Sequence, residues 1–483
     1  MPDIRPILFL IGLLLVALAL AMLLPAALDA LDGDPDWRAF VVSAAITGAV
    51  AGALILGYRQ RGAPVVALRE GCILTVGTWL ALTAFATLPL MLSEARLSFT
   101  DAFFESMSGI TTTGATVFAK LETLPKGLLL WRAMLHWFGG IGIIVTAVAI
   151  LPVLRVGGMQ LFRMESSEKT EKIRPRVSQV SGLLISVYVT LTGLCAAALV
   201  IAGMNPFDAV AHAMSTIATG GFSTRDTSIG YFDSPGIEWI IIVFMTLGAC
   251  PFVLLARVGQ GDLRSFWRDV QVRWFLAYLA GFIAAIALWQ ILVSGRGTAG
   301  AIRSTAFNII SVATGTGFST EDYTLWGGLP LGAITLLFFI GGCTGSTSGG
   351  IKVFRFCVMG SVALWQIRHL VHPHRILPPT YNRNPVSDDV VRSVLSFFVF
   401  YIGCFGLLSI AVSAFGLDLV TAFSGVAQAL GNVGPALGPI IGPAGTYAPL
   451  PDGVKWLLSF AMLRGRLELL TILVLFSPVF WRG

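Results

Sequence analysis

Long apolar runs dominate the pattern of hydrophobic and polar positions along this chain of 483 residues. A helix that crosses the hydrocarbon core of a bilayer needs about 20 mostly apolar residues. The first run is longer than the apolar core of a secretory signal peptide, so we expect it to be a retained helix. We expect ten spanning helices, near 7–28, 38–57, 71–93, 127–152, 179–203, 236–256, 274–294, 328–366 with an interruption, 393–415 and 454–478.

Four shorter apolar segments lie between the long runs, and each ends in a stretch rich in threonine or glycine. The first begins at Asp101 and ends in Thr111-Thr112-Thr113-Gly114. Such a segment is too short to cross a membrane. Extended backbone at membrane depth survives only where it lines water or is buried in protein. Each segment is therefore expected to be a re-entrant half helix followed by an extended glycine strand.

The four short segments are copies in register. Thirteen positions separate the start of each segment from a glycine, in the pairs Asp101 and Gly114, Asp208 and Gly221, Ser304 and Gly317, and Thr421 and Gly434. A pattern that recurs at long spacing indicates one structural unit used several times. We predict an all-α polytopic membrane protein in which four pseudo-repeated units of helix, pore helix and helix surround one central pore.

The repeats divide the chain into five parts. Residues 1–60 contain no short segment and are expected to form an N-terminal transmembrane hairpin outside the fourfold pattern. The four pore units are expected at 61–165, 166–262, 263–375 and 376–483.

Composition and charge agree with a membrane protein. Hydrophobic residues make up 55% of the chain and charged residues 12%, whereas about 25% of residues are charged in soluble domains. Lysine and arginine gather in alternate loops, and such loops stay in the cytoplasm. Both termini are therefore expected in the cytoplasm, with the glycine strands opening outward. The positive loops account for the net charge, so no nucleic-acid partner is implied.

The eighth apolar run is interrupted by the ten residues 341–350, which read GGCTGSTSGG. So many small and hydroxyl residues at membrane depth must line a cavity or pack against protein. The stretch is not a phosphate-binding loop, because Ile351 stands where that motif has its lysine. It is not a nucleophile elbow either, because Thr347 takes the place of the serine. A flexible plug is the interpretation that we keep.

The last apolar run carries Arg464, Arg466 and Glu468. Ionisable residues inside a span indicate function by default. Arg464 and Glu468 are four residues apart and can pair along one helix face, whereas Arg466 faces another side. The sequence leaves two possibilities open, an arginine that faces a central pathway and a purely structural pair.

Four glycine strands around one axis would place backbone carbonyls in rings, which can replace the water shell of a dehydrated monovalent cation. The half helices would point their partly negative C-terminal ends at the same cavity. The fourth strand reads Gly431-Asn432-Val433-Gly434. The ring is therefore only pseudo-symmetric, and its chemistry is expected to rest on carbonyls more than on side chains.

Together these motifs resemble the TrkH family, the membrane subunits of bacterial Trk potassium uptake within the Trk/Ktr/HKT superfamily. The resemblance covers essentially the whole chain and rests on DAFFESMSGITTTGATVF, MSTIATGGFST, SVATGTGFST, GGCTGSTSGGIK and AMLRGRLE. It implies potassium uptake across the bacterial inner membrane through one selective pore per subunit. It also implies a homodimer and a cytoplasmic, nucleotide-binding TrkA-type ring that controls opening. Potassium would be the bound ion, with no catalytic residue and no organic cofactor.

By the same resemblance, three positions in each glycine strand bind the ion. They are Thr112, Thr113, Gly114, Thr219, Gly220, Gly221, Gly315, Thr316, Gly317, Asn432, Val433 and Gly434. Gating is assigned to the interrupted helix and to an arginine beneath the narrow part, at Gly345, Ser346, Thr347, Ser348, Gly349, Gly350 and Arg466.

Four alternatives stay open at the level of sequence. The glycine strands are less uniform than the Thr-Val-Gly-Tyr-Gly filter of ordinary potassium channels, so a weakly selective cation pathway or a sodium- or proton-coupled potassium symporter is possible. Glu105 and Glu468 are the nearest candidates for a coupling residue. An intramembrane enzyme would need His136 or His212. A structural subunit would conduct no potassium at all.

Overall fold

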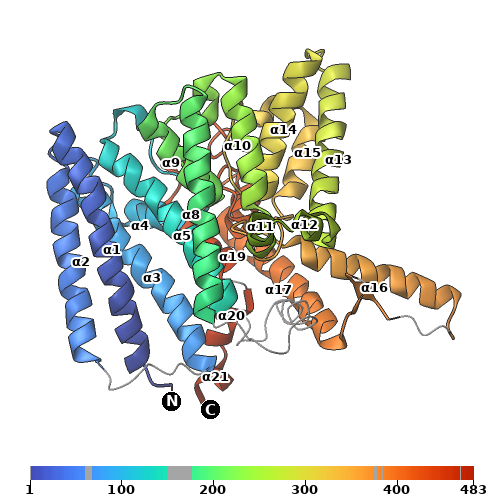
Figure 1. The fold of residues 1–483 in the computed structure, drawn as a ribbon, viewed down its shortest axis with the longest axis horizontal. Coiled ribbons are helices and arrows are strands. Elements are labelled where there is room, and N and C mark those ends of the chain that lie inside the picture. The colour runs from blue at the N-terminus through green and yellow to red at the C-terminus, as the bar shows by residue number, and fades with distance from the viewer. Residues whose placement is uncertain are drawn as a thin grey trace.

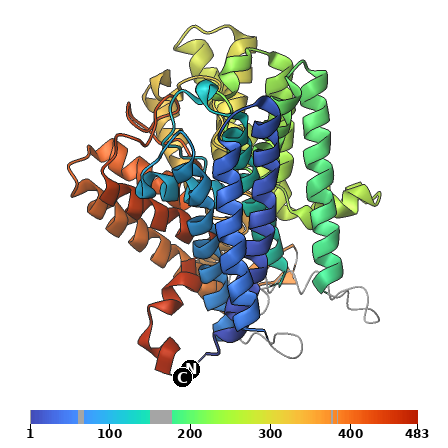
Figure 2. The ribbon, with the colours of Figure 1, turned by 90° about the vertical axis from the view of Figure 1, so that its left-hand side faces the viewer.

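The computed structural model describes residues 2–59, 68–149, 177–374, 378–382, 384–467 and 469–482. These residues form a bundle built almost entirely of helices (Figure 1). Both termini lie at the same end of the bundle (Figure 2). Within the described ranges, seven helices are long and apolar enough to cross a membrane, or eight if one bent pair forms a single span. The predicted class, an all-α polytopic membrane protein, is confirmed.

The first two helices form a hairpin at one edge of the bundle (Figure 1). α1 (Arg5–Asp32) ends at Gly33, which adopts a left-handed conformation with φ of 75°, and α2 (Trp37–Gly57) runs back beside it. The buried carboxylate of Asp29 accepts a hydrogen bond of 2.6 Å from the N–H of Gly127. Gly127 lies in the first turn of α5, so the hairpin is fastened to the repeated part of the molecule.

The rest of the chain repeats one arrangement four times: a helix, a half helix, an extended strand and a second helix. The helices of the first two units are α3 (Leu68–Leu92), α4 (Phe99–Ile110) and α5 (Lys126–Ala149), then α8 (Val177–Ile201), α9 (Pro206–Ile217) and α10 (Pro235–Gly248). Those of the last two are α13 (Val270–Leu292), α14 (Thr298–Thr314), α15 (Gly328–Leu337) and α16 (Val353–Val371), then α17 (Asp388–Ser413), α18 (Leu419–Gly431) and α19 (Asp452–Arg466).

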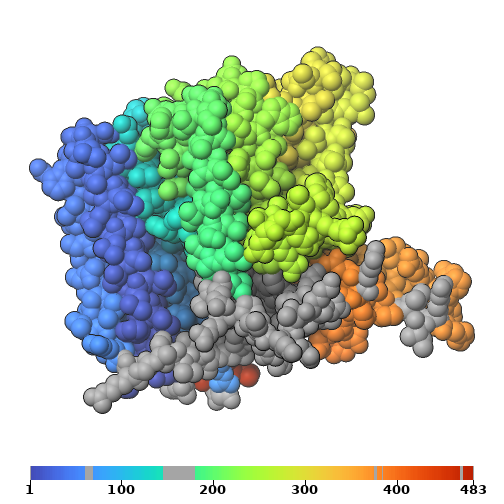
Figure 3. Space-filling view, in the orientation of Figure 1, coloured from blue at the N-terminus to red at the C-terminus, as the bar shows by residue number. Residues whose placement is uncertain are grey.

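Short elements connect these helices. They are η1 (Leu121–Thr123), η2 (Ser228–Phe232), α11 (Phe252–Gly259), α12 (Leu263–Arg268), η3 (Tyr323–Trp326), β1 (Thr380–Tyr381), β2 (Asn384–Pro385), α20 (Leu469–Leu475) and α21 (Pro478–Arg482). The two strands pair antiparallel in a small ribbon that contacts α16. α16 itself projects sideways from the bundle (Figures 1 and 3).

The half helices α4, α9, α14 and α18 contain 12, 12, 17 and 13 residues. They are too short to span the hydrocarbon core, and most of their side chains are buried in the protein. Three begin with a side-chain cap, because Ser98, Asn205 and Asp418 accept hydrogen bonds from backbone N–H groups of the first turn. Capping satisfies donors that would otherwise be stranded in an apolar setting.

Three of the ten predicted spans are not continuous helices. The break between α15 and α16 was expected, but we also predicted unbroken helices over 236–256 and 454–478. The prediction over 236–256 is wrong, because the helix axis bends by 108° between α10 and α11. Pro251, which has no N–H and whose ring clashes with the preceding turn, stands between them. The second is wrong as well, because α19 ends at Arg466 and α20 begins at Leu469.

Candidate ion pathway

Each half helix is followed, within two residues of its end, by a residue in the left-handed conformation. These residues are Thr112, Thr219, Gly315 and Asn432, with φ of 50°, 51°, 72° and 52°. Glycine and asparagine tolerate this region, but a β-branched residue rarely adopts it. The backbone conformation is therefore the same in all four copies although the side chains differ.

A common set of backbone hydrogen bonds fixes this helix end. The N–H after each left-handed residue donates to a carbonyl five residues earlier. The bonds are Thr113 to Ser108, Gly220 to Ser215, and Thr316 to Ser311, each 2.8 Å, and Val433 to Gln428, 3.0 Å. This is the Schellman arrangement, which uses carbonyls that the helix leaves unpaired. It turns the chain out of each half helix in the same direction.

Two residues further on, each strand carries a second left-handed residue, always glycine. The φ values are 85° at Gly114, 82° at Gly221, 81° at Gly317 and 102° at Gly434. A residue with a β-carbon would be strained at such an angle. The four glycines singled out by the thirteen-residue spacing thus occupy one backbone position of the repeated unit.

These four glycines close a ring. A Cβ atom built on Gly114 would collide with the carbonyl oxygen of Gly220, in the second strand. In the same way Gly221 meets the carbonyl of Thr316, Gly317 that of Val433, and Gly434 that of Thr113, where the Cβ would lie 2.6 Å away. Each carbonyl belongs to the residue before the next glycine. The contacts therefore pass from strand one to two, three and four, and return to one.

A hollow of about 70 Å³ lies against this ring. Its walls include all four glycines, together with Thr116, Ser223, Ser319 and Tyr447 from the segments that follow them. Gly114, Gly221 and Gly317 are half-buried, whereas the residues before them in each strand are buried. The ring therefore separates a partly open side from a closed one.

Side chains in the strands are less symmetric than the backbone. Hydroxyls of Thr111 and Thr113 lie 2.8 Å apart, and those of Thr314 and Thr316 lie 2.7 Å apart. In the fourth strand, Nδ2 of Asn432 donates to Oγ1 of Thr113 at 2.9 Å. Within the part of the chain that the structure describes, the hydroxyl of Thr112 and Oδ1 of Asn432 are buried without a hydrogen-bond partner. Such atoms can be satisfied by a bound ion or water.

The interrupted helix of the third unit packs on the closed side of the ring. Oγ1 of Thr347 lies 2.9 Å from the carbonyl oxygen of Ile217, at the end of α9, and 3.0 Å from that of Gly248, at the end of α10. Gly349 touches the backbone of Gly431, just before the fourth strand. Residues 345–350 thus contact the ends of α9, α10 and α18.

The unexpected break after α10 provides partners for this loop. The N–H of Phe252 donates to the carbonyl of Gly345, and the N–H of Cys343 donates to that of Ala249, both at 2.9 Å. Backbone groups freed by the two helix breaks therefore satisfy each other. This pairing explains how both interruptions are tolerated at membrane depth.

Arg466 reaches the same loop from the end of α19. Its side chain is only 3% exposed. Nη1 donates to the carbonyl of Thr347 at 2.7 Å, and Nη2 donates to that of Gly139 at 3.4 Å. Arg464 is buried too, and its Nε has no hydrogen-bond partner among the described residues. The pairing of Arg464 with Glu468 lies outside the described residues.

Of the acidic and histidine candidates, Glu105, His136 and His212 hold neighbouring segments together, whereas Glu468 lies outside the described residues. Glu105 forms a buried ion pair of 2.8 Å with Arg132. Nε2 of His212 is 2.9 Å from Oγ of Ser223, and Nδ1 of His136 is 3.2 Å from Oγ of Ser215. Our sequence reasoning missed this bracing. One signal was available, since Glu105, His212 and Asn308 stand at the same position of three half helices, four residues after the segment begins.

The fold and the ring define a class: a polytopic membrane protein whose four half helices meet around one axis, the arrangement of a cation pathway. The family model TrkH, described as a cation transport protein, matches residues 38–482. The chain belongs to this family.

Individual relatives match over nearly the full length. The Trk system potassium uptake protein TrkI of Halomonas elongata is 43% identical over 480 residues, which cover 99% of this chain and 97% of that protein. The Trk system potassium uptake protein TrkH of Escherichia coli K12 is 39% identical, with 99% of each chain covered. The crystal structure of the potassium transporter TrkH from Vibrio parahaemolyticus superposes with a TM-score of 0.92 at 36% identity, covering 99% of this chain and 100% of that one.

Proposed function

We propose that this chain takes up potassium across the bacterial inner membrane through one selective pore per subunit. The observation that carries the proposal is the closed ring of contacts among Gly114, Gly221, Gly317 and Gly434. Backbone carbonyls in a ring can replace the hydration shell of potassium. The names of the relatives, which are potassium uptake proteins, support this choice of ion.

In this proposal the twelve strand residues predicted from the resemblance form the selectivity filter. Their carbonyls hold the ion, and the left-handed residues turn those carbonyls toward the axis. Thr112, Thr219, Gly315 and Asn432 mark the inner end of the filter, and the four ring glycines mark its outer end. Potassium is the transported ion and needs no resident cofactor.

We further propose that residues 345–350 and Arg466 form the gate. The loop packs beneath the filter, and Arg466 holds its Thr347 carbonyl at 2.7 Å. A buried positive charge there is also an electrostatic barrier to a cation. Movement of the loop would then open the pathway, driven by a cytoplasmic nucleotide-binding ring of TrkA type.

The proposed assembly is a homodimer in the lipid bilayer, with both termini in the cytoplasm. The termini lie at one end of the bundle, which supports placing both on the same side of the membrane (Figure 2), and the lysines and arginines of the alternate loops favour the cytoplasmic side. The division into a hairpin at 1–60 and pore units at 61–165, 166–262, 263–375 and 376–483 belongs to the same proposal.

Flux in liposomes tests the function. Purified full-length protein should carry potassium down its own gradient with no sodium present. Potassium movement that requires a sodium or proton gradient would favour the symporter alternative. A folded preparation that carries no potassium under any gradient would contradict the proposal and favour a structural subunit.

A further inference from the structure

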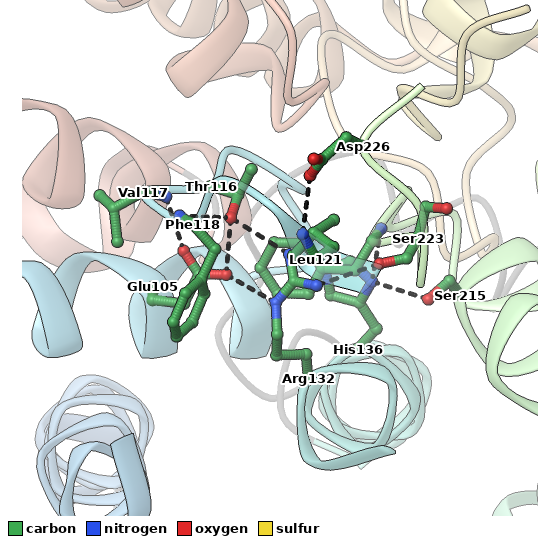
Figure 4. Close-up of polar contacts among 11 residues, drawn as sticks. Glu105, Thr116, Val117, Phe118, Leu121, Arg132, His136, Ser215, Ser223 and Asp226 are labelled. Atoms are coloured by element: carbon green, nitrogen blue, oxygen red, sulfur yellow. Dashed lines mark hydrogen bonds and ion pairs between the residues drawn. The ribbon is translucent and has the colours of Figure 1, made fainter. Parts of the chain in front are cut away.

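Glu105 and Arg132 form a buried ion pair (Figure 4). The pair lies beside the hollow that adjoins the ring of glycines. Nε of Arg132, on α5, lies 2.8 Å from Oε1 of Glu105, on α4, and the two side chains are 1% and 0% exposed. Arg132 is also part of the wall of the hollow. A positive charge at that point would repel an approaching cation. The carboxylate of Glu105 compensates it.

Glu105 holds the first strand just beyond its ring glycine. Oε2 accepts a hydrogen bond of 2.8 Å from the N–H of Val117, and Oε1 accepts one of 3.0 Å from the hydroxyl of Thr116. Hydrogen bonds to an ionised carboxylate are stronger than neutral ones. The path of the chain after Gly114 therefore depends on this side chain.

Arg132 holds the second strand at the equivalent place. Nη1 donates to the carbonyl of Ser223 at 3.0 Å, and the guanidinium lies 4.1 Å from the ring centre of Phe222. Nη2 donates to the hydroxyl of Thr116 in the first strand at 3.1 Å. One guanidinium thus joins both strands two residues beyond Gly114 and Gly221 (Figure 4).

Backbone bonds hold other neighbouring strands. The N–H groups of Ile229 and Gly230 donate to the carbonyl of Ser319, at 3.1 and 3.2 Å, between units two and three. The N–H of Tyr447 donates to the carbonyl of Thr116 at 2.8 Å, between units four and one. Close to the ring, the junction of units one and two instead depends on side chains. Besides Glu105 and Arg132, Nδ1 of His136 lies 3.2 Å from Oγ of Ser215 and 3.4 Å from the backbone nitrogen of Phe222.

We propose that Glu105 and Arg132 are a positioning pair for potassium selectivity. They fix the separation of the first and second glycine strands, and with it the spacing of the carbonyls of Thr113 and Gly220 on that side of the ring. Neither residue touches the ion. This inference rests on the proposed function, because it concerns the same filter.

The test compares potassium and sodium flux in liposomes for Glu105→Gln, Arg132→Met and the double variant of the full chain. Each single change leaves a buried partner uncompensated. The potassium-to-sodium flux ratio should fall about tenfold, the effect of about 1.4 kcal/mol. In the double variant, the flux ratio should fall by less than the sum of the two single effects. Asp32→Asn is the matched control, because Asp32 pairs at the surface with Lys126 of the same helix α5, and its ratio should not change.

An unchanged flux ratio in a single variant that keeps its helix content would overturn the proposal. So would an equal loss of potassium and sodium flux, since that is what a purely structural pair predicts. If the neutral variants do not fold, Arg132→Lys gives the same test. Lysine keeps the charge but not the planar fork, so an intermediate ratio is expected and a wild-type ratio would overturn the proposal. Absence of potassium flux in the wild type would instead contradict the proposed function.

Discussion

Thr112 and Thr219 hold a left-handed backbone that their β-branched side chains disfavour. The sequence identified the glycines of each strand because glycine is the residue that such angles favour. The two threonines were named as filter residues only through the family resemblance, and their positive φ was not predicted, because β-branched residues rarely adopt that region. They became recognisable only when the hydrogen bonds showed that they occupy the position of Gly315 and Asn432. Local residue preference thus located half of the left-handed residues in the first two strands.

Substituting Gly114 should weaken discrimination against sodium. A side chain at this residue would collide with the carbonyl of Gly220, so Gly114→Ser must displace part of the ring. We expect the potassium-to-sodium flux ratio in liposomes to fall about tenfold. Gly416→Ser is the matched control, since Gly416 has φ of 84° but no atoms within 4 Å of an added Cβ. Equal ratios in the two variants would count against the filter assignment.

Removing the charge of Arg466 should speed permeation. Arg466→Ala deletes both the positive barrier and the hydrogen bond to the Thr347 carbonyl, and these losses act in the same direction. Initial potassium flux should rise several-fold over the wild type, whereas Arg466→Lys should stay near it. A well-folded alanine variant that is equally fast or slower would mean that Arg466 serves structure alone.

At the scale of elements, the two interrupted helices differ in how well the sequence predicts them. Ten small or hydroxyl-bearing residues predict the break at 341–350, because such residues at membrane depth must line a cavity or pack against protein. For the break after α10, the one signal in an otherwise apolar run is Pro251. Membrane helices tolerate single prolines, so this signal alone does not predict a break. Tertiary contacts decide whether the helix breaks here, since the backbone groups freed at Gly248 and Ala249 bond to the loop of another unit. No local pattern records that pairing.

Loosening this loop should raise basal flux. Thr347→Val keeps the shape but removes the hydroxyl that lies 2.9 Å from the Ile217 carbonyl and 3.0 Å from the Gly248 carbonyl. The hydroxyl has a single hydrogen to donate to these two carbonyls. Its loss weakens the docked state by about 1 kcal/mol, so potassium flux without any partner protein should increase. Thr246→Val is the control, because that hydroxyl bonds only within its own helix α10. Unaltered flux in Thr347→Val would remove the gating role of the loop.

For the molecule as a whole, spacing alone predicted four units around one axis, and the fold class was right. The thirteen-residue interval established the copies, but it could not establish which strands are neighbours. That order depends on contacts such as Gly114 with Gly220 and Gly434 with Thr113. The sequence could not predict the contact of Glu105 with Arg132 either, because the two residues are 27 positions apart and lie on different helices. Such pairs follow from packing, which a single sequence does not display.

The N-terminal hairpin should contribute stability more than transport. Asp29 is fully buried, and its carboxylate accepts the N–H of Gly127 at 2.6 Å. Asp29→Ala leaves that donor without a partner, so the free energy of unfolding should fall by about 1–3 kcal/mol. Thermal unfolding in detergent would measure the shift, with Asp32→Asn as a surface control. Selectivity in liposomes should stay at the wild-type value, and a changed ratio would contradict the separation of hairpin and pore.

Locating the bound ion tests the central claim most directly. Crystals of the protein grown with rubidium, a heavy substitute for potassium, should show anomalous peaks on the axis enclosed by Gly114, Gly221, Gly317 and Gly434, within contact distance of backbone carbonyls. Well-diffracting crystals with no peak on that axis, or with rubidium bound only elsewhere, would contradict the account.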